Sequence, residues 1–300
     1  MRRLLSAALI LGLIGLGVFL WLTEATIVTA ADLPSHTPDA ERGATIYAMG
    51  GCASCHSAQG EGADPLVLSG GLALKTDFGT FHAPNISPHP EAGIGGWSMA
   101  EFVTAMQQGT RPDGAHYYPA FPFTSYTRMP VEDVMDMKAY MDTLPPSDVA
   151  SLPHDLGFPF NIRRGLGLWK LLYLSDAPVM PESPDAVVAL GQMLVEGAGH
   201  CGECHTPRNA IGGHDKARWL AGGPNPDGPG KIPNITPHSA ALGGWTAEDI
   251  AYYLESGFTP DFDSAGGSMA DVIKNTAQIP AEWRAAIAAY LKSVPDVAPE

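Results

Sequence analysis

The sequence predicts an all-α protein in which two small helical domains follow one another behind an N-terminal membrane helix. Three observations support this fold class. The chain begins with a long apolar run, and the remainder is a repeat with an offset of 149 residues. Neither copy of the repeat shows the alternation of apolar and polar residues that is typical of half-buried strands.

The N-terminal apolar run follows two cationic residues. It extends from Leu4 to Thr23 without a charged residue, close to the ~20 residues that cross a bilayer as a helix. Arg2 and Arg3 are expected to remain in the cytoplasm. The rest of the chain would then lie in the periplasm, on the outer side of a bacterial inner membrane.

A cleaved signal peptide is the alternative for this segment, because "VTA" before Ala31 is an acceptable cleavage site. The apolar part of a signal peptide usually has only ~7–15 residues, fewer than the run found here. Trp21, at the end of the run, suits a membrane interface. The sequence therefore favours a retained single-pass anchor over residues 1–23, followed by a linker over residues 24–38.

The internal repeat is visible in several matched segments. Cys52 and Cys201 are 149 residues apart, as are "PNISPH" from Pro84 and "PNITPH" from Pro233. The segments "AYMDTLP" and "AYLKSVP" match at an offset of 150. Offsets this constant indicate a duplicated domain. We expect a first domain over 39–148, an interdomain linker over 149–184 and a second domain over 185–298.

Helix signals recur at matching places in both copies. Ser98 and Thr246 each precede a helical pattern with a glutamate in its first turn, which predicts an N-cap. Pro130 and Pro280 stand directly before the last helix of each copy. The expected helices are 40–50, 99–108 and 131–143 in the first copy and 187–197, 247–256 and 281–293 in the second.

The centre of the interdomain linker, "GLWKLLYL", is apolar and cationic. Such a segment can pack between two domains or lie on a membrane surface. Packing between the domains is the expected arrangement.

The four cysteines of the chain all lie in two Cys-x-x-Cys-His motifs. A dithiol redox site resembling thioredoxin needs one pair and no following histidine. A structural zinc site commonly has about 15–20 residues between its two pairs, a far shorter spacing than here. Covalent haem attachment explains every residue, because two thiols add to the haem vinyl groups and the adjacent histidine ligates the iron. The expected residues are Cys52, Cys55 and His56, with Cys201, Cys204 and His205.

Longer segments of the sequence resemble a known family. "GGCASCHS", "PNISP", "GIGGW" and "YYPAFPFTSY", the spacer "FPFNIRRGLGLWKLL", and then "CGECHTPRN", "PNITP", "GGWTAEDI" and "GGSMADV" are similar to membrane-anchored di-haem cytochromes c. These cytochromes are in turn similar to the cytochrome subunits of bacterial membrane-bound alcohol, gluconate and related dehydrogenases. The resemblance runs from about Glu41 to Val294. It implies class I-like cytochrome c domains and two covalently bound haem c groups.

The dehydrogenase subunits of this kind usually carry a third haem domain, whereas this sequence has two motifs. Two roles therefore remain open. The chain is either a subunit that serves such a dehydrogenase or a separate carrier that delivers electrons to a terminal oxidase.

The distal ligand decides what each haem does. A methionine completes six-coordination and gives an electron carrier, whereas an open iron permits oxygen or peroxide chemistry. In the second copy we expect Met269, in "GGSMADV", to be this ligand, because no other methionine follows Met193 and the glycines let the backbone approach the iron. An ordinary core methionine is the alternative.

The distal ligand of the first copy is harder to identify. Phe121 stands at the position equivalent to Met269, at an offset of 148. We expect Met129, in "YTRMP", to be the ligand, although it aligns with Ile279 and begins the last helix, where a packing role is the alternative. The other candidates in this copy are Met106, Met135, Met137 and His116.

Asn85 and Asn234 recur in the matched "PNISPH" and "PNITPH" segments. Their side chains could donate hydrogen bonds to buried haem propionates, which would otherwise be costly charges. The alternative is that they shape a loop. The residues alone favour neither.

The chain carries a formal net charge of −15. This charge argues against binding to nucleic acid or anionic lipid and favours basic partners, although it also serves solubility. We expect an electron-transfer protein, not an enzyme, that passes single electrons between a dehydrogenase or other respiratory donor and a terminal acceptor. A haem enzyme, such as a di-haem peroxidase or a thiosulfate-oxidising cytochrome, is the alternative, and a subunit that connects haems within a larger complex is a third.

Overall fold

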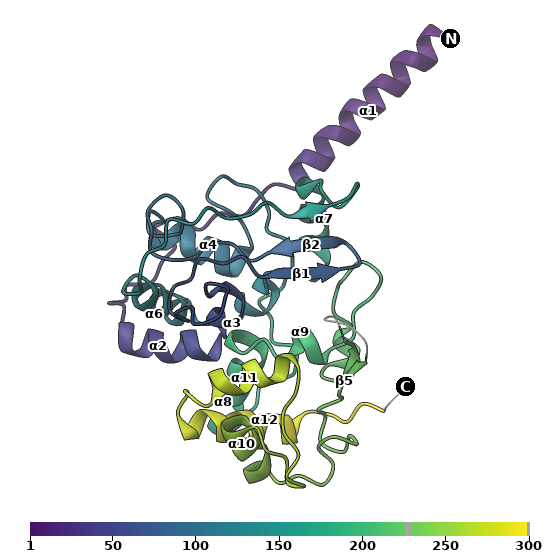
Figure 1. The fold of residues 1–300 in the computed structure, drawn as a ribbon. Helices are drawn as coiled ribbons and strands as arrows, with labels where there is room; N and C mark the ends of the chain where they lie inside the picture. The colour runs from purple at the N-terminus through teal and green to yellow at the C-terminus, as the bar shows by residue number, and fades with distance from the viewer. Residues whose placement is uncertain (226–229, 299–300) are drawn as a thin grey trace.

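The computed structural model describes residues 1–225 and 230–298 (Figure 1). Residues 226–229, within the predicted second domain, lie outside the described part. Helix α1 (Arg2–Leu22) projects from the rest of the molecule and none of its residues is buried. It is long and apolar enough to cross a membrane, a test that a signal sequence near the N-terminus also passes.

The first repeat is built from five helices. They are α2 (Ala40–Met49), α3 (Cys52–His56), α4 (Met99–Gln108), α5 (Phe123–Tyr126) and α6 (Val131–Met141). The second repeat has α8 (Ala186–Met193), a π-helical turn η2 (Leu194–Ala198), α9 (Gly202–His205), η3 (Lys216–Arg218), α10 (Ala247–Ser256), α11 (Ser268–Thr276) and α12 (Ala281–Ser293).

In both repeats the helix before the cysteine motif crosses the last helix at a glycine. A Cβ added at Gly43 of α2 would overlap the Asp136 carbonyl of α6, and one added at Gly191 of α8 would overlap the Ala286 carbonyl of α12. The absence of a side chain therefore permits close backbone contact in each repeat. One hydrophobic core includes residues of both repeats.

The predicted helix starts are confirmed. Ser98 caps α4 and Thr246 caps α10, each in a capping box with the acidic residue three positions later. Pro130 and Pro280 stand at the N-caps of α6 and α12. The two capping boxes satisfy backbone N–H groups that the first helical turn leaves without partners. The prolines make no side-chain cap hydrogen bond and favour a helix start through their fixed φ.

The expectation of an all-α fold is wrong in one respect. The structure is mostly helical, but β1 (Ala73–Thr76) and β2 (Gly79–His82) form an antiparallel hairpin, and β3 (Asp155–Leu156) pairs with β2. In the second repeat β4 (Gly223–Pro224) pairs with β5 (Lys231–Ile232). Strands of two to four residues are too short to show an alternating pattern, so the sequence did not reveal them.

The interdomain segment contacts both repeats, which confirms the expected packing. It contains η1 (Arg163–Gly165) and α7 (Leu166–Tyr173). Lys170 Nζ donates hydrogen bonds to the carbonyls of Gln108 and Gly109 in the first repeat, at 2.6 and 2.7 Å. Trp169 Nε1 donates to the Ile211 carbonyl in the second repeat at 2.9 Å. The leucines Leu168, Leu171 and Leu172 of the same helix are exposed.

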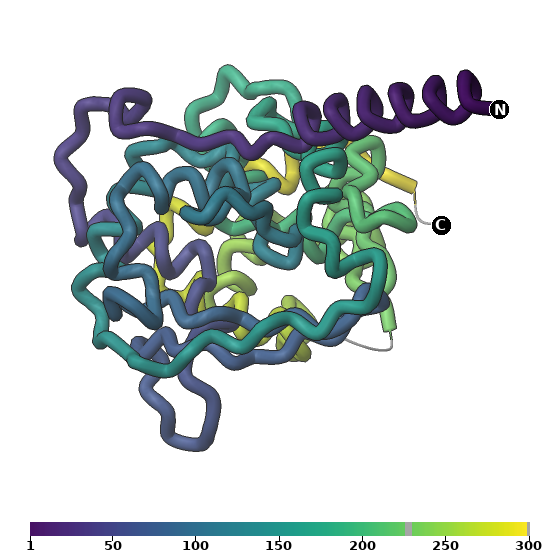
Figure 2. Tube along the Cα trace, turned by 90° about the horizontal axis from the view of Figure 1, so that it is seen from above, coloured from purple at the N-terminus to yellow at the C-terminus, as the bar shows by residue number. Residues whose placement is uncertain are grey.

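The chain between α1 and α2 runs along the outside of the first repeat (Figure 2). The backbone N–H of Val28 donates to Thr104 Oγ1 of α4 at 2.9 Å. Farther along, His36 Nε2 lies 2.6 Å from Asp136 Oδ1 of α6. This segment therefore covers part of α4 before the chain enters the helical core.

Candidate functional site

Each Cys-x-x-Cys-His motif forms one short helical turn. Helix α3 begins at Cys52 and ends at His56, and α9 follows Cys201 and ends at His205. Residues three apart on a helix lie on the same face, so the two cysteines of each motif are neighbours. Gly51 precedes α3 with a φ of 59°, a left-handed conformation that glycine adopts without strain.

The histidine of each motif is oriented by a proline carbonyl. His56 Nδ1 donates a hydrogen bond to the Pro84 carbonyl at 2.8 Å, and His205 Nδ1 donates to the Pro233 carbonyl at 2.9 Å. This bond places the proton on Nδ1 and leaves Nε2 with a lone pair for a metal. The sequence showed that "PNISPH" and "PNITPH" are repeated, but it did not show that their prolines orient the histidines. The repetition of this segment after each motif was the one signal of a shared role.

Burial sets the protonation of these groups. It lowers the pKa of His56 and of His205, with the proline hydrogen bonds opposing it, so both imidazoles are neutral at pH 7. Burial raises the pKa of Cys52 and of Cys201 to about 12. A dithiol redox centre needs a readily formed thiolate, which neither Cys52 nor Cys201 offers. Within residues 1–225 and 230–298 no group of three His, Cys, Asp or Glu side chains is arranged to hold a metal ion.

The paired asparagines hold loops. Asn85 Nδ2 donates to the carbonyls of Ser147 and Val149, both at 2.8 Å, while its Oδ1 accepts the Ser87 N–H at 2.9 Å. Asn234 Nδ2 likewise donates to the Val297 carbonyl at 2.9 Å. These contacts favour the loop-shaping alternative over propionate binding. They tie the proline segment that orients each histidine to the chain after the last helix.

The distal candidates lie in different settings. Met269 is in the first turn of α11 and is partly buried against the core. Met129 lies between α5 and α6 and is only 4% exposed; its Cγ is 3.3 Å from the position of a Cβ added at Gly197. Phe121, the counterpart of Met269, packs edge-to-face on Tyr126. The ligand assignments of Met129 and Met269 stay predictions.

His116 is occupied away from the motif. Its Nε2 donates to the Thr23 carbonyl at 3.0 Å, and its side chain is buried beside Gly167 of α7. Met106, Met135 and Met137 are all buried in the core. The structure thus commits His116 Nε2 to a backbone carbonyl, and the choice between Met129 and the other candidates stays a prediction.

Both motifs lie at the interface of the repeats. In the first motif Ser54 Oγ accepts a hydrogen bond from Asn275 of α11 at 2.8 Å. At the equivalent position of the second motif, Glu203 Oε1 accepts from the hydroxyls of Thr124 and Ser125 of α5, at 3.0 and 2.9 Å. Helix α5 contacts η2, and α11 contacts α2. Each repeat thus contacts the motif of the other through the helix next to its distal-ligand candidate, α5 in the first repeat and α11 in the second.

Residues directly before the motifs extend this interface. His200 Nε2 donates to the Gly50 carbonyl at 3.2 Å, and its ring lies edge-to-face with Tyr126 at 5.7 Å between centroids. Burial opposes ionisation of Glu203, but the adjacent His214 and Arg208 outweigh it and lower the pKa of Glu203 to about 2. Sequence reasoning missed this interface, because nothing in a repeat pattern tells how two copies dock.

Comparisons with known proteins agree with this geometry. The cytochrome c family model matches residues 40–145. A protein of Cereibacter sphaeroides described as "Diheme cytochrome c-type" is 56% identical over 303 residues, which cover 99% of this chain and all of that protein. The fructose dehydrogenase cytochrome subunit of Gluconobacter japonicus is 37% identical over 91% of this chain, and the cytochrome c subunit of the Gluconobacter oxydans quinone alcohol dehydrogenase is 35% identical over 88%.

The chain spans 55% and 57% of the length of those two dehydrogenase subunits. The residues present fit two haem c groups, since each repeat offers two neighbouring thiols and an imidazole whose Nε2 is directed away from its hydrogen-bonded Nδ1. From its full-length relative and its duplicated attachment motifs, the chain belongs to the di-haem c-type cytochromes and carries two covalently bound haem c groups.

Proposed function

We propose that this cytochrome is a membrane-anchored carrier of single electrons between a dehydrogenase or respiratory donor and a terminal acceptor in the bacterial periplasm. The haems supply the redox chemistry, and the protein binds, orients and shields them. The observation that carries the proposal is that both attachment motifs lie at the interface of the repeats, each hydrogen-bonded to the other repeat. A single hydrophobic core around both motifs supports a fixed relation between them.

The axial ligands of the proposal are His56 with Met129 and His205 with Met269. Thioether sulfur binds ferrous iron well, raises its potential and excludes oxygen, as an electron carrier requires. The partly buried place of Met269 at the start of α11 supports its role. The burial of Met129 fits either ligation or packing.

A retained anchor is supported by how the end of α1 is held. Thr23 is fully buried; its Oγ1 accepts a hydrogen bond from Arg164 Nε at 2.8 Å, and its carbonyl accepts one from His116. Arg164 also donates to the Leu20 carbonyl at 2.7 Å. Cleavage before Ala31 would remove all three acceptors and leave these donors, one of them buried, without partners.

Exposed apolar side chains beside α1 support the same topology. Leu171 and Leu172 of α7 are 61% and 70% exposed, and α7 lies close to the base of α1 (Figure 1). An apolar surface at the level where a membrane helix ends fits the headgroup region of the bilayer. We therefore propose that the exposed leucines of α7 contact the bilayer beside α1.

A haem enzyme is the second candidate, and one observation favours it. Phe121 replaces the methionine at the position of Met269, so the first iron would lack a distal ligand there. The enzyme alternative needs such an open iron, whereas the carrier needs both irons six-coordinate.

Carbon monoxide binding to the reduced protein separates the two functions. The carrier predicts two low-spin haems that do not bind carbon monoxide and that titrate as two one-electron centres. Binding of carbon monoxide at one haem of the wild-type protein would replace the carrier by the enzyme. Washed membranes are expected to retain the protein, and a mature N-terminus at Ala31 would contradict the anchor alone.

A further inference from the structure

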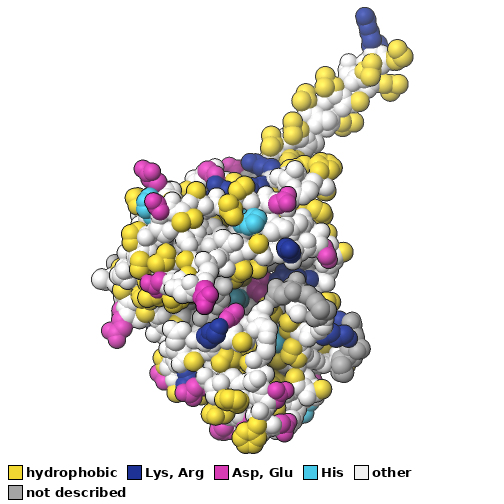
Figure 3. All heavy atoms as spheres, in the orientation of Figure 1, with side chains coloured by type: hydrophobic (Ala, Val, Ile, Leu, Met, Phe, Trp, Pro, Cys, Tyr) yellow, Lys and Arg dark blue, Asp and Glu magenta, His cyan; other side chains and the backbone are white. Residues whose placement is uncertain are grey.

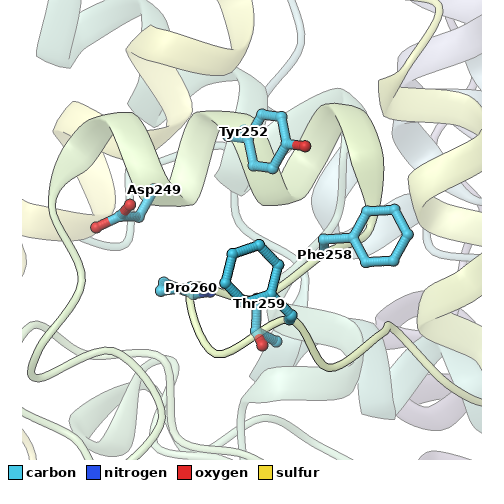
Figure 4. A pocket seen from close by; sticks show the side chains of 6 residues that line it. Asp249, Tyr252, Phe258, Thr259 and Pro260 are labelled. Carbon is cyan, nitrogen blue, oxygen red and sulfur yellow. The ribbon is translucent and has the colours of Figure 1, made fainter.

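Three aromatic side chains are exposed together at the end of the molecule farthest from α1. Tyr252 on α10 is 57% exposed, and Phe258 and Phe262 on the following hairpin are 48% and 89% exposed. With Asp249, Thr259 and Pro260 they line an open pocket of about 390 Å³ (Figure 4). We call Tyr252, Phe258 and Phe262 the aromatic patch.

The first repeat has no such patch at the same place. At an offset of 148 residues, Thr104 and Thr110 stand where the second repeat has Tyr252 and Phe258. Both threonines are buried, at 3% and 0% exposure. The corresponding face of the second repeat is therefore open where that of the first is closed.

The cover over the first repeat comes from outside its helical core. The backbone of Val28 donates to Thr104 Oγ1, and Lys170 of α7 donates to Thr110 Oγ1 at 3.2 Å. Helix α4 consequently buries six of its residues, whereas α10 buries two. Large aromatic side chains stand where no chain segment shields them from solvent.

The conformation of Phe262 adds a second reason to expect a partner. Its φ is 62°, in the left-handed region that large side chains rarely occupy, and its counterpart Gly114 has a φ of 80°. A side chain this exposed contributes little to the packing of its own fold. Strained residues of this kind are common where a protein binds something else.

Charge restricts what can cover the aromatic patch. Residues 247–273 include six Asp and Glu and no Lys or Arg. The nearby cations of α12 are engaged, Arg284 with Glu255 at 3.1 Å and Lys292 with the Trp245 carbonyl at 2.9 Å. Acidic side chains flank apolar ones at this end of the molecule (Figure 3).

We propose that the aromatic patch is the docking site of a redox protein with an apolar contact surface surrounded by lysines and arginines. Interfaces of this type combine a central group of aromatic residues with a charged rim that steers association. The inference rests on the proposed electron-transfer function. The hairpin of the patch leads into the glycines before Met269, so a docked partner would contact the distal segment of the second repeat.

A lipid surface does not fit this patch. The patch lies at the end of the molecule opposite α1 (Figure 1), and the acidic residues of 247–273 around it would be repelled by anionic lipid headgroups. A second copy of the chain would bring two acidic rims together, which is unfavourable at low salt. A basic protein satisfies both the apolar and the charged part of the surface.

The test measures binding to the oxidised full-length protein in detergent, with a strongly basic mitochondrial cytochrome c as the probe. Wild type is expected to bind the probe transiently, with an affinity that falls as salt is raised. Phe262→Gly should weaken binding about tenfold, equivalent to ~1.4 kcal/mol, while its Tm stays unchanged or rises because glycine relieves the backbone strain. Glu248→Gln with Asp261→Asn should reduce the salt dependence.

Val187→Ser is the matched control, because Val187 is 51% exposed on α8 of the same repeat but lies outside the patch. It should bind the probe as wild type does. Wild-type affinity in Phe262→Gly, or binding that ignores salt, would overturn the docking site. Self-association of wild type that Phe262→Gly abolishes would assign the patch to a second copy instead.

The outcomes also separate this inference from the function on which it rests. If the protein has two six-coordinate haems and exchanges electrons with the probe, but Phe262→Gly does not change probe binding, the proposed function stands and the docking site is wrong. A protein that binds the probe through the patch but exchanges no electrons with it loses the proposed function instead.

Discussion

The proximal sides of the two repeats match closely, and their distal sides do not. On the proximal side, His56 and His205 each donate to a proline carbonyl, and the asparagine after that proline ties its loop to the segment after the last helix of its repeat. On the distal side, Met269 opens a helix of nine residues, whereas the first repeat has Phe121 before a helix of four. A few local hydrogen bonds fix the proximal side, so it is the same in both copies. The distal side depends on longer segments that differ between them.

The largest expected effect tests the shared proximal side. Replacing Cys52 and Cys55 together by serine should remove one covalent haem, because the thioether bonds of that motif cannot form. Replacing Cys201 and Cys204 should remove the other. Intact mass and haem staining of denatured protein measure the result. A double variant that retains both haems, or a protein that contains zinc, would contradict the attachment.

The distal side is tested by two methionine variants. Met269→Ala should lower the potential of one haem and open it to carbon monoxide, since the thioether that fills the sixth position is lost. Met129→Ala should do the same to the other haem. Redox titration and carbon monoxide difference spectra follow both changes.

The two methionine results are not equivalent. Met269 is the last methionine of the second repeat, where no other methionine follows Met193, whereas Met129 aligns with Ile279 and stands where a packing role is the alternative. An unchanged first haem in Met129→Ala would assign that methionine to packing against Gly197 and direct the search to His116 or Met106. It would leave the assignment of Met269 intact.

The asparagine variants sharpen the comparison of the loops. Asn85 is 3% exposed and makes three hydrogen bonds to the backbone, so Asn85→Ala should cost ~1–3 kcal/mol of unfolding free energy. Asn234 donates to the Val297 carbonyl and accepts from the N–H and hydroxyl of Thr236, but it is less buried than Asn85, so water can replace these partners and Asn234→Ala should cost only ~1 kcal/mol. Denaturant unfolding of both variants measures the difference. Equal costs would mean that the loops are held by other contacts.

A charged contact between the repeats, that of Glu203 with Thr124 and Ser125, gives an effect that depends on pH. The pKa of Glu203 is about 2 in the folded protein and ~4.3 when unfolded. Its carboxylate therefore stabilises the fold above pH ~4.3, and this contribution is lost as the pH falls towards 2. Glu203→Gln should cost ~1.5–3 kcal/mol at pH 6, the range for hydrogen bonds to a charged group.

Thermal unfolding at several pH values measures this dependence. The gap between wild type and Glu203→Gln should narrow below pH ~4.3. Ser54→Ala is the matched control, because its hydrogen bond with Asn275 involves no carboxylate and its cost should not change with pH. A gap that stays constant for Glu203→Gln would show that its ionisation does not matter to the interface.

Local chemistry explains what the sequence could predict. The cysteine motifs, the N-caps at Ser98 and Thr246 and the helix starts after Pro130 and Pro280 each depend on a few neighbouring residues. Such features are legible in a single sequence. The β1–β2 hairpin and the β4–β5 pair were missed because strands so short carry no periodic signal.

Long-range contacts explain what it could not. The hydrogen bond from Asn275 to Ser54 joins residues 221 positions apart; Ser54 is one of the two unspecified positions of its Cys-x-x-Cys-His motif, and Asn275 belongs to no motif. The contact of Thr23 with Arg164 and Gly167 likewise cannot be predicted from the sequence, because it forms only in the folded chain. The same applies to His116, which the sequence offered as an iron ligand and which the fold directs to a backbone carbonyl.

The reciprocal contacts between the repeats resemble the self-complementary interface of a symmetric homodimer, in which each partner presents the same surface to the other. Joining both partners in one chain keeps them associated at any dilution, because the linker holds them at a high effective concentration. It also permits an inequality that identical subunits cannot have. Glu203 is charged where its counterpart Ser54 is neutral. Covalent fusion thus allows two nearly identical binding sites to acquire different electrostatic environments one residue at a time.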